Sequence, residues 1–399
     1  MKLTAEAKKA ILIGGLCALA YLAVYVARNI LSAVTPEMIA SGLFTTEAIG
    51  TMSSLFFIAY AVGQLINGLL GEKIKAAYMI SGGLLLAGIA TILFPLFADS
   101  LAATYILYGA TGFFLAMIYA PMTKVVAENT SPLYAPRCSL GYTFSSLFGS
   151  PIAGLMAAVM LWVPVFFSSG AILLIMGIVC MVVFKTLENR GVIRYGVYTR
   201  PKGSGGSIRI LIQHQIIRFT LISAVTGVVR TTVVFWMPTY LSQHLNFSPK
   251  TAAILFTVAT IAISAAPFIT VFLYERLRHD MNLTIRVCFI LSALAFLIVF
   301  CVHQPTINIV FLILAILAAN SAASLMWTRY CPGLRDTGMV SSATGYLDFI
   351  SYMAASVSSK LFSNAVSAIG WGNLILIWFA LMASGFLVTL PQSKTANNL

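Results

Sequence analysis

Apolar runs of about twenty residues recur from one end of this 399-residue chain to the other. Each run is long enough to cross a hydrocarbon layer of ~30 Å as a helix. Only 9% of the residues are charged and 60% are hydrophobic, too few charges to cover the surface of a soluble protein. A β-barrel is excluded, because its strands would be short and alternating. The sequence therefore predicts an all-α membrane protein with about twelve transmembrane helices. Their approximate ranges are 10–34, 47–70, 76–97, 101–126, 138–162, 164–185, 213–243, 250–274, 282–303, 306–329, 338–368 and 371–391.

One long polar connection, about 186–210, separates the sixth run from the seventh. It is rich in arginine and contains the flexible sequence Gly-Ser-Gly-Gly at 203–206. We therefore predict a six-helix bundle over 1–188, a cytoplasmic linker over 189–212 and a second six-helix bundle over 213–399.

The two predicted bundles repeat each other in sequence. In each, an arginine is followed eight positions later by a proline: Arg28 and Pro36 in the first, Arg230 and Pro238 in the second. The short sequences Glu-Lys-Ile-Lys at 72–75 and Glu-Arg-Leu-Arg at 275–278 correspond in the same way, and so do Gly-Tyr pairs at 141–142 and 345–346. All the offsets lie close to two hundred residues. This agreement favours two pseudo-symmetric halves with a substrate site at their interface.

The basic residues between the apolar runs predict the orientation of the chain. Nearly all of them fall on one side of the predicted bundle, whereas the opposite loops carry acidic residues, with Lys250 as the clear exception. Cytoplasmic loops are enriched in Lys and Arg. Both termini and the linker are thus expected in the cytoplasm, and the short loops favour a bacterial inner membrane.

Other functional classes find little support. The six cysteines and four histidines are scattered without the spacing of a metal site or a disulfide framework. No catalytic triad spacing or phosphate-binding glycine loop is recognisable, so neither an enzyme nor a cofactor is expected. The net charge of +13 is spread between apolar segments rather than over a domain, which argues against nucleic-acid binding.

Arg28 and Arg230 are the most informative polar residues. A charge inside a membrane helix is costly and usually faces a cavity or a partner. If the two halves are pseudo-symmetric, these arginines face each other at similar depth. Two planar guanidinium groups suit bidentate capture of a phosphate or carboxylate. The alternative is that each pairs with a structural acid or extends to the membrane surface.

Several other polar residues share helix faces with one another or with Arg28. Tyr21 and Tyr25 precede Arg28 by seven and three positions, and Tyr60 and Gln64 are four apart on the second span. Asp348 and Tyr352 are also four positions apart, on the eleventh predicted span. Asp348 could be a counter-ion for an arginine of the empty site, which we favour, or a proton-coupling carboxylate or a structural partner.

Two motifs carry a family resemblance over essentially the whole chain. They are Y-x-x-x-Y-x-x-R at Tyr21–Arg28 and R-x-x-x-x-x-W-x-P-T-Y-L at Arg230–Leu241. They resemble the organophosphate:phosphate antiporter family of the major facilitator superfamily. The resemblance implies the fold of that superfamily and exchange of a phosphorylated metabolite for inorganic phosphate. It also implies that Arg28 and Arg230 bind phosphate, and that Tyr21, Tyr25, Tyr60 and Tyr352 line the cavity.

Three positions depart from the pattern of that family. Gln64 stands where better-known members have a lysine, and Asn29 stands where a basic residue often follows the first arginine. Ser146 stands where glycerol-phosphate transporters carry a histidine. The predicted pocket keeps its arginine pair but has less positive charge around it than the pocket of better-known members. The substrate could therefore be a less charged one or another organic anion.

We therefore predict a monomeric transporter that exchanges a sugar phosphate or glycerol phosphate for inorganic phosphate across the lipid bilayer by alternating access. One alternative is a proton-coupled transporter of another organic anion, with Asp348 titrating. Another is a transporter-like membrane sensor of sugar phosphates.

Overall fold

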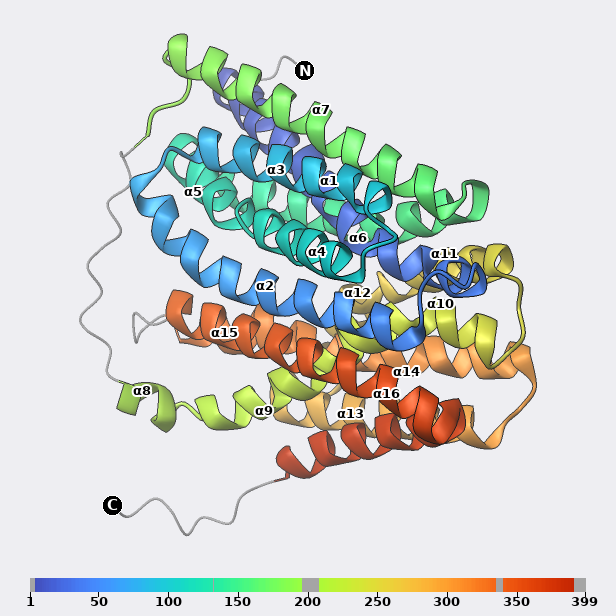
Figure 1. Ribbon diagram of the computed structural model, residues 1–399. Helices are drawn as coiled ribbons and strands as arrows, with labels where there is room; N and C mark the ends of the chain where they lie inside the picture. Colours follow the sequence, from blue (N-terminus) through green and yellow to red (C-terminus); the bar gives the residue numbers. More distant parts are fainter. Residues whose placement is uncertain (1–3, 132, 196–207, 335–339, 391–399) are drawn as a thin grey trace. The chain divides into compact units, whose positions relative to one another are not determined.

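The computed structural model describes residues 4–131, 133–195, 208–334 and 340–390 (Figure 1). Within these ranges the chain is helical and no strand is present. Eleven of the helical stretches are long and apolar enough to cross a membrane. The predicted all-α membrane fold is therefore confirmed.

The helices of the first half of the chain are α1 (Ala5–Ala40), α2 (Thr46–Lys73), α3 (Ala76–Leu96), α4 (Leu101–Leu115), α5 (Tyr119–Asn129), α6 (Ala135–Val159) and α7 (Trp162–Asn189). Those of the second half are α8 (Ile208–Gln213), α9 (Ile216–Gly227), the π-helical segment η1 (Val228–Val233), α10 (Val234–Gln243), α11 (Pro249–Ile263), α12 (Ala266–Arg276), α13 (Met281–Cys301), α14 (Pro305–Leu325), the π-helical segment η2 (Met326–Tyr330), α15 (Cys331–Gly333) and α16 (Val340–Val388).

Short polar side chains mark the starts of several helices. The hydroxyl of Thr45 accepts a hydrogen bond from the backbone of Ala48 at the start of α2 (3.2 Å). The carboxylate of Asp280 accepts one from Leu283 at the start of α13 (2.9 Å). Such caps satisfy N–H groups that the helix itself leaves unpaired, and each contributes about 1 kcal/mol.

The last membrane segment is two helices rather than one. Gly370 has φ 76° and ψ 171°, which no helical residue adopts, and it divides α16 into two legs. The chain turns back at this point, in the red part of Figure 1. A positive φ is strained for other residues and free for glycine. With α16 counted as two crossings, the eleven candidate spans agree with the predicted number of about twelve.

The chain forms two compact units. The first holds residues up to Pro201 together with Phe235–Ile261 and Ser356–Ser367, and the second holds the remainder. In the first unit α1 packs against α6 and α7, α3 against α4 and α7, and α2 against α4. In the second, α14 packs against α9, η1, α12 and α13. The bundle boundaries at 188 and 213 stay a prediction.

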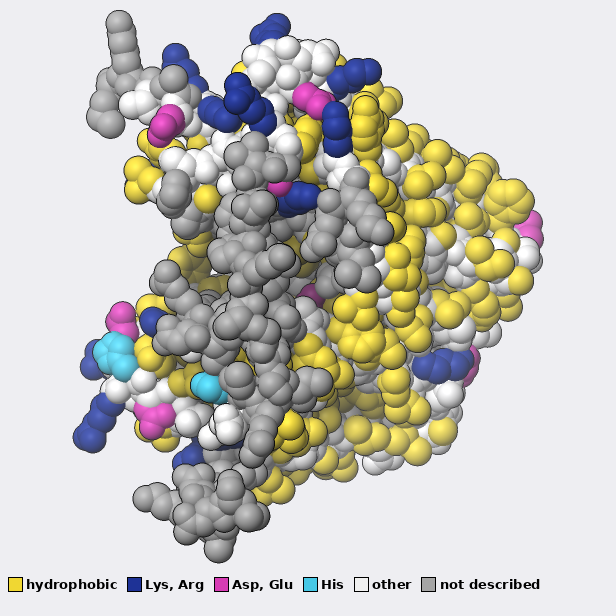
Figure 2. All heavy atoms as spheres, turned by 90° about the vertical axis from the view of Figure 1, so that its left-hand side faces the viewer, with side chains coloured by type: hydrophobic (Ala, Val, Ile, Leu, Met, Phe, Trp, Pro, Cys, Tyr) yellow, Lys and Arg dark blue, Asp and Glu magenta, His cyan; other side chains and the backbone are white. Residues whose placement is uncertain are grey.

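Hydrophobic side chains form much of the surface. Leu96, Val159 and Ile217 are examples, each more than half exposed. Figure 2 shows such side chains over much of the face in view, whereas Lys and Arg side chains stand in a few separate groups. This separation is what a membrane protein needs, because its middle meets lipid tails and its ends meet head groups and water.

Candidate functional site

Arg28 lies in the first unit among three aromatic rings. Its guanidinium carbon is 5.3 Å from the ring centroid of Tyr25, 5.3 Å from that of Tyr60 and 5.9 Å from that of Phe57. Tyr25 belongs to the same helix, α1, whereas Tyr60 and Phe57 come from α2. Each contact attracts the cation to the ring face, by about 0.5–2 kcal/mol depending on exposure. Two predicted site residues, Tyr25 and Tyr60, are thus brought to Arg28.

The backbone near Arg28 is held close to α6. An added Cβ on Gly149 of α6 would lie 2.6 Å from the carbonyl carbon of Tyr25, so only glycine fits there. Next to the arginine, the side chain of Asn29 donates a hydrogen bond to the carbonyl of Tyr25 (2.6 Å). Asn29 is therefore used to brace α1, at the position where the family often has a second basic residue.

Tyr21 belongs to a cluster of tyrosines one turn from Tyr25. Its ring centroid is 4.9 Å from that of Tyr25, 5.5 Å from that of Tyr119 and 6.1 Å from that of Tyr142. Tyr21 is buried within this cluster. The structure thus links Tyr21 to Arg28 through Tyr25.

Gln64 and Ser146 are the two remaining predicted site residues of the first unit. Gln64 lies one turn beyond Tyr60 on α2 and is half-buried. Ser146 falls within α6, and its side chain lies outside the described residues. Neither is tested as a ligand by the structure, so both stay predictions.

Arg230 lies in the second unit within the π-helical segment η1. Its guanidinium donates a hydrogen bond to the hydroxyl of Ser351 in α16 (3.3 Å). The guanidinium carbon is also 5.9 Å from the ring centroid of Trp327, which belongs to the other π-helical segment, η2. Such segments are rare and are frequent at functional sites. Here two of them carry an arginine and its aromatic partner.

A second glycine brings α9 close to α16 beside Arg230. An added Cβ on Gly227 would lie 2.7 Å from the carbonyl oxygen of Ser351 and 2.8 Å from its Cα. The backbone of the arginine-bearing helix therefore contacts the backbone that carries its hydrogen-bond partner. Close approach through small residues is typical of membrane helices.

Asp348 and Tyr352 lie on the same leg of α16 as Ser351. Asp348 is half-buried and lies near Cys331, while Tyr352 is buried. The hydrogen-bond acceptor of Arg230 is Ser351, one turn from Asp348. The proposed roles of Asp348 as counter-ion or proton carrier stay predictions.

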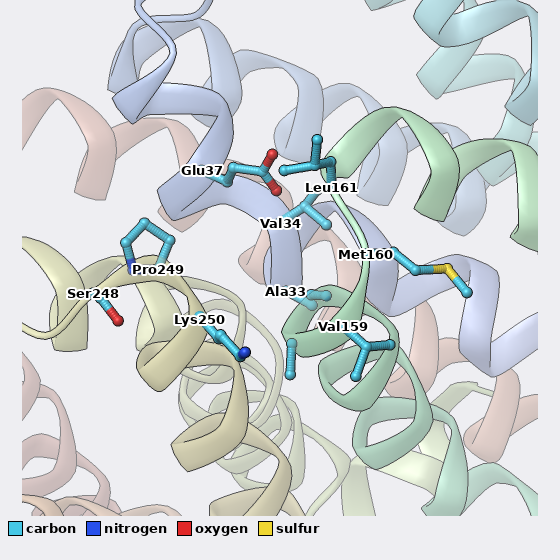
Figure 3. Close-up of a pocket in the computed structure, with 11 residues that line it drawn as sticks. Ala33, Val34, Glu37, Val159, Met160, Leu161, Ser248, Pro249 and Lys250 are labelled. Atoms are coloured by element: carbon cyan, nitrogen blue, oxygen red, sulfur yellow. The ribbon is translucent and has the colours of Figure 1, made fainter.

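The first unit also holds a cavity of about 390 Å³, which none of the predicted site residues lines. Glu37 reaches it from α1 and Lys250 from α11, and most of the other lining residues are apolar, including Val34, Val159 and Leu161 (Figure 3). Lys250 is the clear exception to the predicted charge asymmetry, and the structure places it opposite an acid.

One ion pair lies outside the membrane segments, near the ends of α2 and α7. Lys75 and Glu188 form an ion pair at 2.5 Å. Glu188 raises the pKa of Lys75 above its ordinary value, because it accepts a hydrogen bond from the ammonium group and attracts its charge. Nearby, burial raises the pKa of Tyr195 to about 12. The pair joins the start of α3 to the end of α7 within the first unit.

Sequence reasoning missed Phe57, Trp327 and Ser351. Phe57 precedes Tyr60 by three positions, so the helical period could have placed it on the same face. Ser351 follows Asp348 by three positions and could have been found in the same way. Trp327 had no local signal.

Comparison with known proteins identifies the fold family. The model of the Major Facilitator Superfamily matches residues 17–359. The chain belongs to this superfamily. A bacterial homolog of the human lysosomal transporter Spinster has the same fold, with a TM-score of 0.70 at 14% identity over 96% of this chain and 94% of that one. A D-xylose–proton symporter gives a TM-score of 0.72 at 11% identity over 98% and 99% of the two chains.

Two of the similar curated proteins are named for phosphorylated metabolites. Membrane sensor protein UhpC of Salmonella typhimurium is 35% identical over 96 residues, 24% of this chain and 22% of its own length. Glucose-6-phosphate exchanger SLC37A2 of Homo sapiens is 44% identical over 50 residues, 12% and 10% of the two chains. The glycerol-3-phosphate transporter of Bacillus subtilis is 26% identical over 253 residues, 58% and 57%. These relatives belong to the organophosphate:phosphate antiporter family, which confirms the predicted resemblance. The chain spans less than two thirds of the length of each.

Proposed function

We propose that this protein exchanges a phosphorylated metabolite, a sugar phosphate or glycerol phosphate, for inorganic phosphate by alternating access. The observation that carries the proposal is that Arg28 and Arg230, one in each unit, both lie within membrane spans and both contact aromatic ring faces. A ring on the face of a guanidinium fixes its plane, while its N–H donors point outward along the edge. That is how a guanidinium is presented to an oxyanion.

Exchange follows from the charges. Two arginines that approach each other without an anion repel, whereas a bound phosphate group bridges them. The occluded state is then stabilised only when an anion occupies the site. Return of the empty carrier is slow, and the outward and inward movements of two anions become coupled.

The remaining parts of the proposal rest on sequence. Tyr21, Tyr25, Tyr60, Gln64, Ser146, Asp348 and Tyr352 would line the cavity between two bundles, 1–188 and 213–399. The basic residues favour cytoplasmic termini and a cytoplasmic linker over 189–212. We place the protein as a monomer in a bacterial inner membrane.

The test is counterflow into phosphate-loaded proteoliposomes with a panel of sugar phosphates, glycerol phosphates and dicarboxylates. Arg28→Lys and Arg230→Lys should each lower exchange of inorganic phosphate at least tenfold, because a point charge replaces a bidentate fork worth about 1.5–3 kcal/mol. Arg137→Lys, at an exposed arginine, is the matched control and should exchange normally. Near-normal phosphate exchange by either of the first two variants would refute the proposal.

A second candidate is a membrane sensor of sugar phosphates, favoured by the similarity to UhpC. It predicts that a sugar phosphate protects the purified protein against thermal unfolding, while no member of the panel enters phosphate-loaded vesicles. Measurable counterflow would exclude this candidate.

A further inference from the structure

Two arginines converge on the end of α16 in the second unit, away from Arg230. The carbonyl oxygen of Thr389 accepts a hydrogen bond from Arg218 of α9 and another from Arg286 of α13, each at 2.9 Å. Arg218 also donates to the carbonyl of Val388 (3.1 Å) and to the side chain of Gln215 (3.1 Å). Three helices are thus joined by two guanidinium groups.

The charge at this point is not balanced within the described part of the chain. The carboxyl end of a helix carries about half a negative charge, against two full positive charges. No carboxylate of the described residues lies within 4.0 Å of either guanidinium. The two donor nitrogens share one acceptor, so their separation cannot exceed twice 2.9 Å.

One donor is left over at the same place. The Nε of Arg286 is buried and has no hydrogen-bond partner among the described residues. A buried donor without a partner is costly, and one on a charged group more so. Capping of a helix end needs only one of the two arginines, and Arg218 already does it with two bonds. Arg286 therefore has a charge and a donor that capping does not use.

Exposed apolar side chains lie close in sequence to the arginines and to the end of α16. Ile217, which precedes Arg218 in the chain, is 61% exposed, and Leu387 is 62% exposed at the end of α16. Ile290 is 37% exposed, one turn beyond Arg286 on α13. Arg286 is five residues from the start of its membrane helix, about 7.5 Å, which is the depth of lipid head groups. Positive charge at head-group depth and apolar surface beside it match the two parts of a phospholipid.

We propose that Arg218 and Arg286 bind the phosphate of an anionic phospholipid, whose acyl chains lie along Ile290 and Leu387. Free phosphate could balance the charge equally well but would leave the apolar surface unused. Basic pockets between membrane helices are known binding sites for such head groups. The lipid site does not include Arg28 or Arg230, so a negative result for lipid binding would leave the transport proposal unaffected.

The test uses the full-length protein purified in mild detergent and analysed by native mass spectrometry after addition of phosphatidylglycerol. Arg286→Gln is the test variant, because it removes the unused donor while Arg218 keeps both bonds to the end of α16. We expect the fraction with bound phosphatidylglycerol to fall roughly tenfold. Arg276→Gln/Arg278→Gln is the control; it removes two exposed charges of the same unit and should bind as the wild type does.

Two further arms distinguish the source of the anion. Phosphatidylcholine, which has no net charge, should bind at least tenfold less to the wild type than phosphatidylglycerol does. Inorganic phosphate should not displace bound phosphatidylglycerol at millimolar concentration. Equal loss in the control variant, equal binding of phosphatidylcholine, or displacement by inorganic phosphate would each overturn the proposal.

Discussion

Replacing Gly149 with alanine tests how the first arginine is positioned. The new Cβ would lie 2.6 Å from the carbonyl carbon of Tyr25 and 2.9 Å from its carbonyl oxygen. Carbon atoms in contact normally stay ~3.5–4.0 Å apart, so α1 and α6 must separate by about 1 Å at this level. Because the obstacle is backbone, it cannot rotate away.

The magnitude follows from that overlap. Overpacking by one methyl group costs about 1–3 kcal/mol, and a backbone obstacle places Gly149→Ala at the upper end. Gly141 of the same helix gives a matched control, because an added Cβ there meets nothing within 4 Å. Alanine is a better helix former than glycine, so Gly141→Ala should stabilise by about 0.5–1 kcal/mol. The two substitutions are chemically identical and are expected to have opposite signs.

The assay is unfolding of the purified protein by titration with sodium dodecyl sulfate. A thiol-reactive dye reports unfolding, since five of the six cysteines are buried. The displacement also moves Tyr25, whose ring is 5.3 Å from the guanidinium carbon of Arg28, so phosphate exchange should fall with stability. If Gly149→Ala proved as stable as Gly141→Ala, the close approach of α1 and α6 at Tyr25 would be refuted.

Two further predictions concern polar contacts between helices. Lys360 of α16 donates to the hydroxyl of Thr51 in α2 (2.6 Å), so Lys360→Met should lower stability by about 1.5–3 kcal/mol in the same titration, whereas Lys250→Met at an exposed lysine should change it little. An equal effect of both would argue against the contact. The ion pair of Lys75 with Glu188 should stabilise fully below the ordinary lysine pKa of 10.5 and lose its contribution as the pH rises through the higher folded pKa. The thermal midpoint of Glu188→Gln should therefore differ from that of the wild type at pH 8 and converge with it above pH 10.5; a difference independent of pH would contradict this.

The sequence predicted the membrane helices and part of the surroundings of Arg28. Long apolar runs have one structural solution in lipid, since every backbone group must be bonded within the helix. Helical periodicity then placed Tyr25 beside Arg28. Tyr60 reached the same arginine from another helix, and there the family resemblance supplied what periodicity could not.

The surroundings of Arg230 could not be predicted in the same way. Its partner Trp327 is one of five tryptophans in a chain that is 12% aromatic, and nothing local separates a ring that contacts a cation from one that packs in the core. The π-helical geometry of η1 and η2 also has no recognisable sequence signature, because it depends on how one helix accommodates its neighbours rather than on residue type.

The glycines show most clearly what the internal repeat does and does not determine. Arg28 and Arg230 occupy equivalent repeat positions, yet the glycine at the close approach beside them lies on a different helix in each half. In the first unit the glycine at the close approach, Gly149, lies on the neighbouring helix and contacts Tyr25; in the second, Gly227 lies on the arginine's own helix and contacts Ser351. The offset between the halves therefore predicts where each arginine lies along its helix. The side chains that orient it follow from packing within each unit, where the two halves have diverged, so the two guanidinium groups need not contribute equally to binding. Exchange by Arg28→Lys and by Arg230→Lys should consequently be compared at several phosphate concentrations, which gives the affinity for phosphate and the maximal rate of each variant. If the surroundings are unequal, the two variants should differ in how far each of these quantities falls.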